Sequence, residues 1–173
     1  MEKRVEDILG LITRDTGLTD SFTLAGKQGK HLNISGFARE QKAYVMAALA
    51  RLSGRKPVVI VPDAARAREI AKGLGAFTEG GVSVLMPSEL SLVTAEAASR
   101  DLELSRCIAL SNIITGEYGA VVIASGALLN KLEPAKKFRK RILDVKYGKP
   151  LEQDVLLEYL RTNGYERVPR RHS

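Results

Sequence analysis

The chain has 173 residues, 45% of them hydrophobic, so it can bury one ordinary core together with a small additional unit. A single cysteine excludes a disulfide framework and a cysteine-based metal site, which indicates a reducing cytoplasm. No apolar run approaches the roughly 20 residues that span a bilayer, so we expect no membrane association. The net charge of +7 favours acidic partners such as nucleic acid, although excess lysine and arginine is also common on solvated surfaces.

The amino-terminal quarter is predicted to hold a helix, a loop and a short strand. Four apolar residues are spaced as on one helical face: Val5, Ile8, Leu9 and Ile12. They predict a helix that ends near Gly17. The stretch SFTLAGKQGKHLNIS carries glycines and then alternates at Leu32 and Ile34, which predicts a loop leading into a short strand. Within it, GKQGK is interpreted as a solvated turn. A helix is expected over about 38–52.

From KPVVIVPD onward, strands and helices alternate regularly. The stretches KPVVIVPD, VSVLMP and AVVIAS are short β-branched runs that predict three buried strands. Helices are expected in AARAREIAKGL, over about 95–115, and in GALLNKLE. This alternation predicts a doubly wound α/β domain with a parallel sheet, helices on both faces and right-handed crossovers. We expect the domain, with the amino-terminal helix, to cover residues 1–133.

After Pro134 the composition changes, and a second unit is expected over residues 134–173. It opens with the basic stretch AKKFRKR. RILDVKYG follows, with Leu143, Val145 and Tyr147 alternating onto one face, and LEQDVLLEYLRTNGY has the pattern of an amphipathic helix.

A nucleotide-hydrolysing domain of the doubly wound class needs a glycine-rich loop whose amides hold the phosphates. Such a loop reads GxxxxGK[ST] between the first strand and the first long helix, where this chain reads NISGFAREQKAYVMAAL. Its remnants are Ser35, Gly36 and Lys42. No second glycine precedes the lysine and no hydroxyl follows it. Phe37 and Arg39 would crowd a phosphate, and Glu40 would place a carboxylate beside it. We therefore expect no bound cofactor.

Other reactive side chains favour structural roles. Asp63 and Ser125 each follow a strand, where we interpret them as helix caps rather than catalytic groups, since a nucleophile elbow needs GxSxG with a distant acid and histidine. His31 and His172 lie far apart in sequence and suggest no metal site. Cys107 lies among apolar residues of a helix, as a core cysteine does.

One cluster of cations could contact a polyanion: Lys136, Lys137, Arg139, Lys140 and Arg141. We predict contact with nucleic acid or a protein partner there. The alternative is a merely solvated charge run, because no aromatic stacking pattern accompanies the cluster.

Three stretches together resemble the amino-terminal region of bacterial transcription-repair coupling factors, the Mfd family. They are NISGFAREQKAYVMAALARLSGRKPVVIVPDAARAREIAKGL, LMPSELSLVTAEAASRDLELSRCIALSNIITGEYGAVVIASGALLNKLEP and ILDVKYGKPLEQDVLLEYLRTNGYERV. The resemblance covers about residues 20–168 and rests on their order and spacing. It implies a helicase-like, P-loop NTPase-like domain 1a over 1–133. It also implies the start of an inserted UvrA-binding domain 2, a small incomplete α+β unit, over 134–173.

The resemblance further implies a scaffold in transcription-coupled nucleotide-excision repair that recruits UvrA and restrains a motor. RNA polymerase and DNA would be partners through the full-length relative, whose separate motor uses ATP and Mg²⁺. The family's UvrA-contacting arginines would lie beyond this chain, so none is carried over. With domain 2 truncated, residues from about Pro134 onward are expected to be less stable than the preceding domain.

Two other functions remain open on the sequence alone. The excision-repair helicase UvrB shares this region and retains a working GxxxxGKT, so a UvrB-type ATPase is the first alternative. An unrelated small-molecule enzyme on a doubly wound fold is the second, and it would require a deep pocket with titratable groups at the strand ends.

Overall fold

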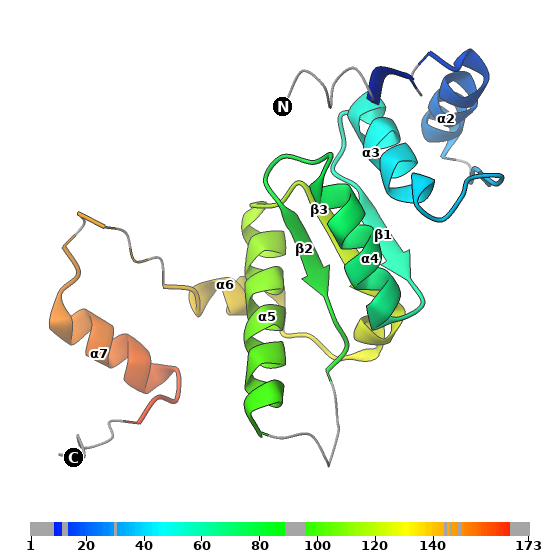
Figure 1. Cartoon of the computed structure of the whole chain (residues 1–173). Coiled ribbons are helices and arrows are strands. Elements are labelled where there is room, and N and C mark those ends of the chain that lie inside the picture. Colours follow the sequence, from blue (N-terminus) through cyan, green and yellow to red (C-terminus); the bar gives the residue numbers. More distant parts are fainter. Residues whose placement is uncertain are drawn as a thin grey trace. The chain divides into compact units, whose positions relative to one another are not determined.

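The computed structural model describes residues 9–11, 14–29, 31–88, 96–143, 145, 147–148 and 150–166 (Figure 1). The chain divides into two compact units, Met1–Leu132 and Glu133–Ser173. The first holds a parallel sheet with flanking helices, which confirms the α/β class. Its helicase-like identity, and the family names of both units, stay predictions. Most of the helix predicted around Val5 and Ile12 lies outside the described residues.

The helix α2 (Thr16–Gln28) occupies residues where the sequence predicted a loop. Asp15 initiates it, because its carboxylate accepts a hydrogen bond from the backbone N–H of Leu18 at 3.1 Å. The helical residues 9–11 are separated from α2 by Arg14 and Asp15, which are not helical, and the chain leaves α2 at Gly29 with φ 63°. The loop prediction was therefore wrong over residues 21–28, because Gly26 lies inside α2 and an interior glycine costs a helix only about 1 kcal/mol.

Residues 31–38 link α2 to α3 (Gln41–Ser53) without forming a helix or a strand. The short strand predicted around Leu32 and Ile34 is therefore wrong for this described segment. Both side chains are more than a third exposed, and neither residue pairs with a strand of the sheet. The helix α3 is confirmed, and it ends in a left-handed turn at Gly54.

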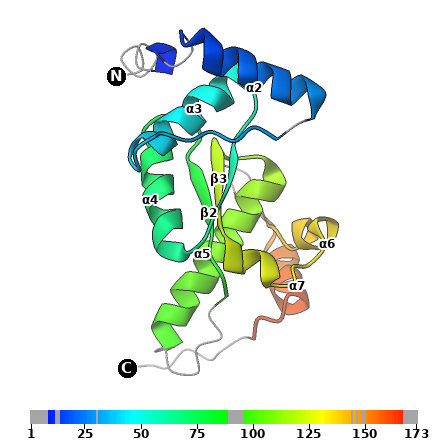
Figure 2. The ribbon, with the colours of Figure 1, turned by 90° about the vertical axis from the view of Figure 1, so that its right-hand side faces the viewer.

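The rest of the first unit alternates strand and helix as predicted. The elements are β1 (Val58–Val61), α4 (Ala64–Gly75), β2 (Val82–Leu85), α5 (Glu96–Thr115) and β3 (Ala120–Ala124). All strand pairs are parallel, in the order β1-β3-β2. Figure 2 shows α4 and α5 on opposite faces of the sheet. Within the described part of the chain, no helix has the length and apolar character needed to cross a bilayer.

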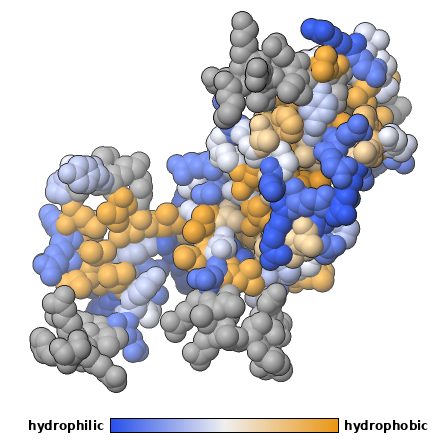
Figure 3. All heavy atoms as spheres, in the orientation of Figure 1, coloured by the Kyte–Doolittle hydropathy of each residue, from blue (hydrophilic) through white to orange (hydrophobic). Residues whose placement is uncertain are grey.

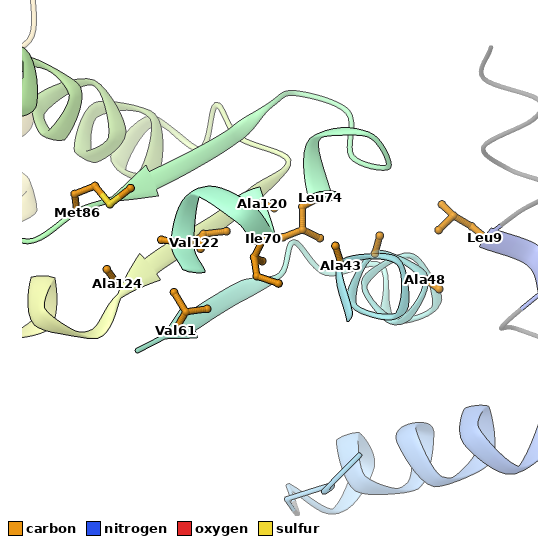
Figure 4. Close-up of a cluster of buried hydrophobic side chains, with 12 residues drawn as sticks. Leu9, Ala43, Ala48, Val61, Ile70, Leu74, Met86, Ala120, Val122 and Ala124 are labelled. Carbon is orange, nitrogen blue, oxygen red and sulfur yellow. The ribbon is translucent and has the colours of Figure 1, made fainter. Parts of the chain in front are cut away.

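The core lies between the sheet and the α3–α4 layer. Leu74 of α4 and Val122 of β3 are its largest completely buried side chains, and each contributes about 1.5–3 kcal/mol by leaving water. Figure 4 shows Leu74 and Ile70 of α4 lying between Val122 of β3 on one side and Ala43 of α3 on the other. Small side chains on α3, such as Ala43, let α3 and α4 approach closely. The turn that enters α3 is held in place by this contact between the two helices.

Helices lie on both faces of the sheet, as predicted, but the face opposite to α4 is covered only in part. The helix α5 packs on β2, where Ser83 and Leu85 are buried. On the edge strand β1, Val58 and Ile60 alternate onto the same face and are each 59% exposed. One helix is too narrow to reach across three strands, so β1 keeps an apolar face open.

The helix predicted in GALLNKLE is only a 3₁₀ turn, η1 (Ser125–Leu129). Of its apolar side chains, Ala127 is buried, whereas Leu128 and Leu129 are 55% and 88% exposed. Without a face to bury, and with Pro134 ahead, the turn gains nothing by continuing as an α-helix.

The second unit contains α6 (Ala135–Lys140) and α7 (Gln153–Thr162), and neither helix has a buried residue. The alternation at Val145 and Tyr147 does not form a strand, and both side chains are exposed. The described part of this unit is thus helical rather than α+β. Figure 3 shows apolar atoms gathered on the surface of α7. The Tyr159 hydroxyl donates a hydrogen bond to the Arg141 carbonyl, tying α7 to the end of α6.

Candidate functional site

The turn that enters α3 and the first turn of this helix hold the three residues that the sequence suggested as remnants of a nucleotide loop. Ser35, Gly36 and Lys42 line one cavity of about 630 Å³, whose lining also includes β1. Gly36 has φ 91°, a conformation that glycine adopts without strain. The Gln41 side chain closes the turn, since its Oε1 accepts a hydrogen bond from the backbone N–H of Ala38 at 2.9 Å. The sequence thus identified three residues that the fold does bring together.

The surroundings of this turn differ from those of a phosphate-binding loop. Such a loop joins the end of a strand to a helix and aims free backbone N–H groups at the phosphates. Here residues 31–38 are not a strand, and the N–H of Ala38 is already bonded to Gln41. Glu40 is exposed at the N-cap of α3 and makes no capping hydrogen bond. Its carboxylate is placed where it would repel an anion at the helix end.

An ion-pair network links the turn to α4. Arg39 donates from Nε to both carboxylate oxygens of Glu69, at 2.7 and 3.0 Å, and makes a further contact through Nη2. Arg66 donates to the same carboxylate at 3.0 Å. The hydrogen bonds that Arg39 donates to Glu69 hold the pKa of Glu69 below its ordinary value. The same hydrogen bonds raise the pKa of Arg39. The network fixes the turn against α4, across 30 residues of sequence.

The carboxyl ends of the strands meet at the edge where open α/β sheets place ligands. Asp63 caps α4, accepting a hydrogen bond from the N–H of Arg66 at 2.8 Å, as predicted. The capping role predicted for Ser125 is wrong: its hydroxyl donates to the Pro62 carbonyl at 2.8 Å and ties the end of β3 to the end of β1.

Two further hydrogen bonds join polar groups of the protein at this edge. The Asn130 side chain accepts a hydrogen bond from the N–H of Ser88 at 3.0 Å, and Arg106 donates to the Met86 carbonyl. Among the residues that the structure describes, no group of three or more metal-binding side chains is found. The described residues of this edge therefore offer neither a nucleophile beside a base nor a pair of carboxylates, and the hydrogen bonds named here are structural.

The cationic cluster predicted from the sequence lies on α6 and its carboxyl end. All five side chains are exposed: Lys136, Lys137, Arg139, Lys140 and Arg141. Glu133 neutralises part of the cluster, because it forms ion pairs with Lys137 at 3.0 Å and with Arg141 at 3.4 Å. No ion pair joins Lys136 or Lys140 to a residue in the described ranges. These two lysines are the cations best placed to meet an external anion.

Cys107 and the histidines play no part in these sites. Cys107 is exposed, so its predicted place in the core is wrong. The sheet is contacted through another face of α5, where Ala109 is buried, and Leu104 and Ile108 are exposed together with Cys107. His31 is also exposed, and His172 lies outside the described residues.

A second cavity, of about 760 Å³, lies at the amino ends of the strands. Lys56 lies over the Tyr118 ring, 4.8 Å from its centroid, and donates to the Gly116 carbonyl at 2.8 Å. Open α/β sheets bind ligands at the other edge, and this lysine is already held by the protein. The cavity is therefore a weaker candidate than the one beside β1.

Sequence reasoning missed the network of Arg66 and Glu69, as well as the apolar lining beside β1. The spacing of Arg66 and Glu69 three apart on α4 was an available signal, whereas the meeting of Phe37 and Met46 with β1 depends on tertiary packing. No family model, no curated protein and no solved structure matches this chain.

Proposed function

We propose that this chain is a non-hydrolysing, partner-binding module of the transcription-repair coupling factor type. In that role it serves transcription-coupled nucleotide-excision repair by recruiting UvrA and restraining the motor of the full-length protein. RNA polymerase and DNA are partners of the full-length protein, and ATP and Mg²⁺ belong to its motor. The module itself uses no cofactor.

The turn that enters α3 is the observation that carries this proposal. It follows no strand, Gln41 occupies one of its N–H groups, and Glu40 adds a negative charge at the helix end. Each of these features lowers affinity for a triphosphate. The edge at the carboxyl ends of the strands also argues against a small-molecule enzyme. Asp63 and Ser125, which follow two of these strands, are both engaged in structural hydrogen bonds.

The second unit supports a binding role. The helix α7 has no buried residue, although Val155 and Leu157 are large apolar side chains, 52% and 46% exposed. Apolar surface gathered on one helix marks a surface that another chain can cover. Lys136 and Lys140 add positive charge in the same unit. We therefore propose that this unit is the part of the chain that binds UvrA.

A UvrB-type ATPase is the second candidate, favoured by one observation. Ser35, Gly36 and Lys42 line the same cavity, and that cavity has the volume of an ordinary ligand pocket. In this alternative the lysine would approach the phosphates and the turn would open to admit them.

Isothermal titration of Mg²⁺–ATP into the chain separates the two candidates. The proposal requires no saturable heat, with UvrB as the positive control under the same conditions. Saturable binding that Lys42→Ala abolishes would replace the scaffold with the ATPase.

Binding to immobilised UvrA tests the recruiting role. Leu157→Glu should weaken that binding about tenfold by placing a charge on the apolar face of α7. Glu158→Gln on the same helix is the control and should bind like the unmodified chain. Absence of UvrA binding to the unmodified chain would remove the recruiting role.

A further inference from the structure

The open edge of β1 carries backbone groups that point away from the sheet. The N–H of Val121 on β3 donates to the Pro57 carbonyl at 2.9 Å, so that carbonyl faces β3. The direction of the N–H and C=O groups alternates along a strand. The backbone groups of Val59 therefore also point toward β3, whereas those of Val58 and Ile60 point away from the sheet at its open edge. No backbone hydrogen bond joins Val58 or Ile60 to the 31–38 segment or to other residues in the described part of the chain outside the β1–β3 pair. This edge is a template for another strand.

A groove runs beside this edge and has an apolar lining. It is the cavity of about 630 Å³ described above, and residues 34–37 form one wall while β1 forms another. Figure 2 shows the chain between α2 and α3 crossing in front of the strands. The apolar side chains of the groove outside β1 are Ile34, Phe37, Val45, Met46, Leu49 and Ile70. A strand added to β1 would place every second side chain in this groove and the others beside exposed Val58 and Ile60.

The charged residues that line the groove are both cationic. Lys42 and Arg66 line it, and its lining contains no carboxylate. Arg66 is paired with Glu69, but no ion pair joins Lys42 to another residue that the structure describes. Lys42 also lies in the first turn of α3, where the helix dipole adds positive potential. The groove therefore complements apolar and acidic side chains that alternate along an extended chain.

We propose that the edge of β1 and its groove bind an extended peptide segment of a protein partner in which apolar and acidic residues alternate. The segment adds to the sheet as a fourth strand, with its backbone bonded to Val58 and Ile60. This inference deepens the proposed partner-binding role and rests on it. A second copy of the chain fits less well, because its β1 reads VVIV and offers no carboxylate to Lys42.

An NMR titration of the full chain tests this docking site. The probe is an acetylated and amidated peptide, VEVEVE, and the matched peptide is VKVKVK. The acidic peptide should give saturable shifts at the amides of Val58 and Ile60 and across 35–42, with at least about tenfold higher affinity than the basic one. A third peptide, methylated on every backbone nitrogen, keeps the acidic side chains but lacks all N–H groups and should not bind.

A charge reversal on the exposed lysine sharpens the test. Lys42→Glu should reverse the preference between the acidic and basic peptides, whereas the same change at exposed Lys72 of α4, outside the groove, should leave it unchanged.

The inference is overturned by equal affinity for both peptides or by no shift at Val58 and Ile60. It is also overturned if residues 32–35 already pair with β1 in the free chain, or if sedimentation shows a dimer that Ile60→Asp dissolves. UvrA binding without peptide binding would remove this inference alone, whereas saturable ATP binding would remove the proposed function whatever the peptides do.

Discussion

A side-chain carbon placed on Gly73 of α4 would lie 2.6 Å from the Cβ of Ala43 on α3. Real side-chain carbons do not approach so closely, so the α3–α4 packing requires glycine at this position. Gly73→Ala should destabilise the first unit by about 1–3 kcal/mol, as overpacking of a tight contact does. Urea unfolding measures the loss. Gly75→Ala on the same helix is the control, because its new carbon would meet Val82 only at 3.9 Å.

The same contact can be tested by compensation. Ala43→Gly removes the opposing carbon, so the double variant should recover part of the stability that Gly73→Ala loses. Strict additivity of the two single changes would show that the α3–α4 contact does not limit stability.

Asp63 supplies the cap of α4, and its removal should be measurable. Asp63→Ala deletes the acceptor of the Arg66 N–H, which is 2.8 Å away, so unfolding free energy should fall by about 1 kcal/mol. Asp63→Asn keeps an acceptor oxygen and should retain most of the stability. Equal losses in both variants would mean that the negative charge, rather than the hydrogen bond, stabilises the helix.

The Glu69 network should make stability depend on pH at the acidic end. Hydrogen bonding by Arg39 lowers the pKa of Glu69 in the folded chain, so ionised Glu69 favours folding. This contribution is complete above the unfolded pKa of about 4.3 and disappears as pH falls through the lower folded value. Unmodified chain and Glu69→Gln should therefore differ in urea midpoint at pH 7, and the difference should shrink as the pH falls below the unfolded pKa. The difference should also shrink in high salt, because the pair is exposed. A difference that stays constant as the pH is lowered through the acidic range would contradict the assignment.

The strands could be predicted from the sequence, whereas the extent of their burial could not. VVIV, VSVL and AVVIA are short β-branched runs between helical stretches, so local pattern located all three. The exposure of Val58 and Ile60 depends on how far α5 extends across the sheet, which no local pattern encodes. For the same reason Cys107 was misplaced, since apolar neighbours on a helix do not say which face meets the sheet.

Glycine caused the opposite error at the amino end. The glycines of the GKQGK stretch resemble helix breakers, yet Asp15 caps a 13-residue helix that runs through Gly26 and ends at Gln28. At the site, Gly36 and Lys42 could be selected from the sequence because they have the spacing of the first glycine and the lysine of GxxxxGK, and Ser35 directly precedes them. The apolar lining beside them comes from α3, α4 and β1 packing together, so only the fold could reveal the groove.

Lys136 and Lys140 should govern any affinity of the second unit for DNA. Both are exposed, whereas Lys137 and Arg141 are partly neutralised by Glu133. Replacing both lysines by alanine should weaken duplex DNA binding and lower the slope of log affinity against log salt by about 2. Fluorescence anisotropy across salt concentrations measures the slope. The double change Lys27→Ala and Lys72→Ala, in the first unit, is the control, and an equal effect there would indicate general charge rather than a site on α6.

Amide exchange should separate the two units by stability. The helix α7 has no buried residue, and an isolated helix of its length is marginal in water, so its amides should exchange through local opening at low free-energy cost. The central strand β3, with Val122 completely buried, should exchange only through global unfolding. The helix α3 is the matched control, because it is also a helix but has five buried residues. If α7 amides proved as slow as those of Val122, the second unit would have to share the cooperative core of the first. The apolar surface of α7 would then be structural, and it could no longer support a binding role for this unit.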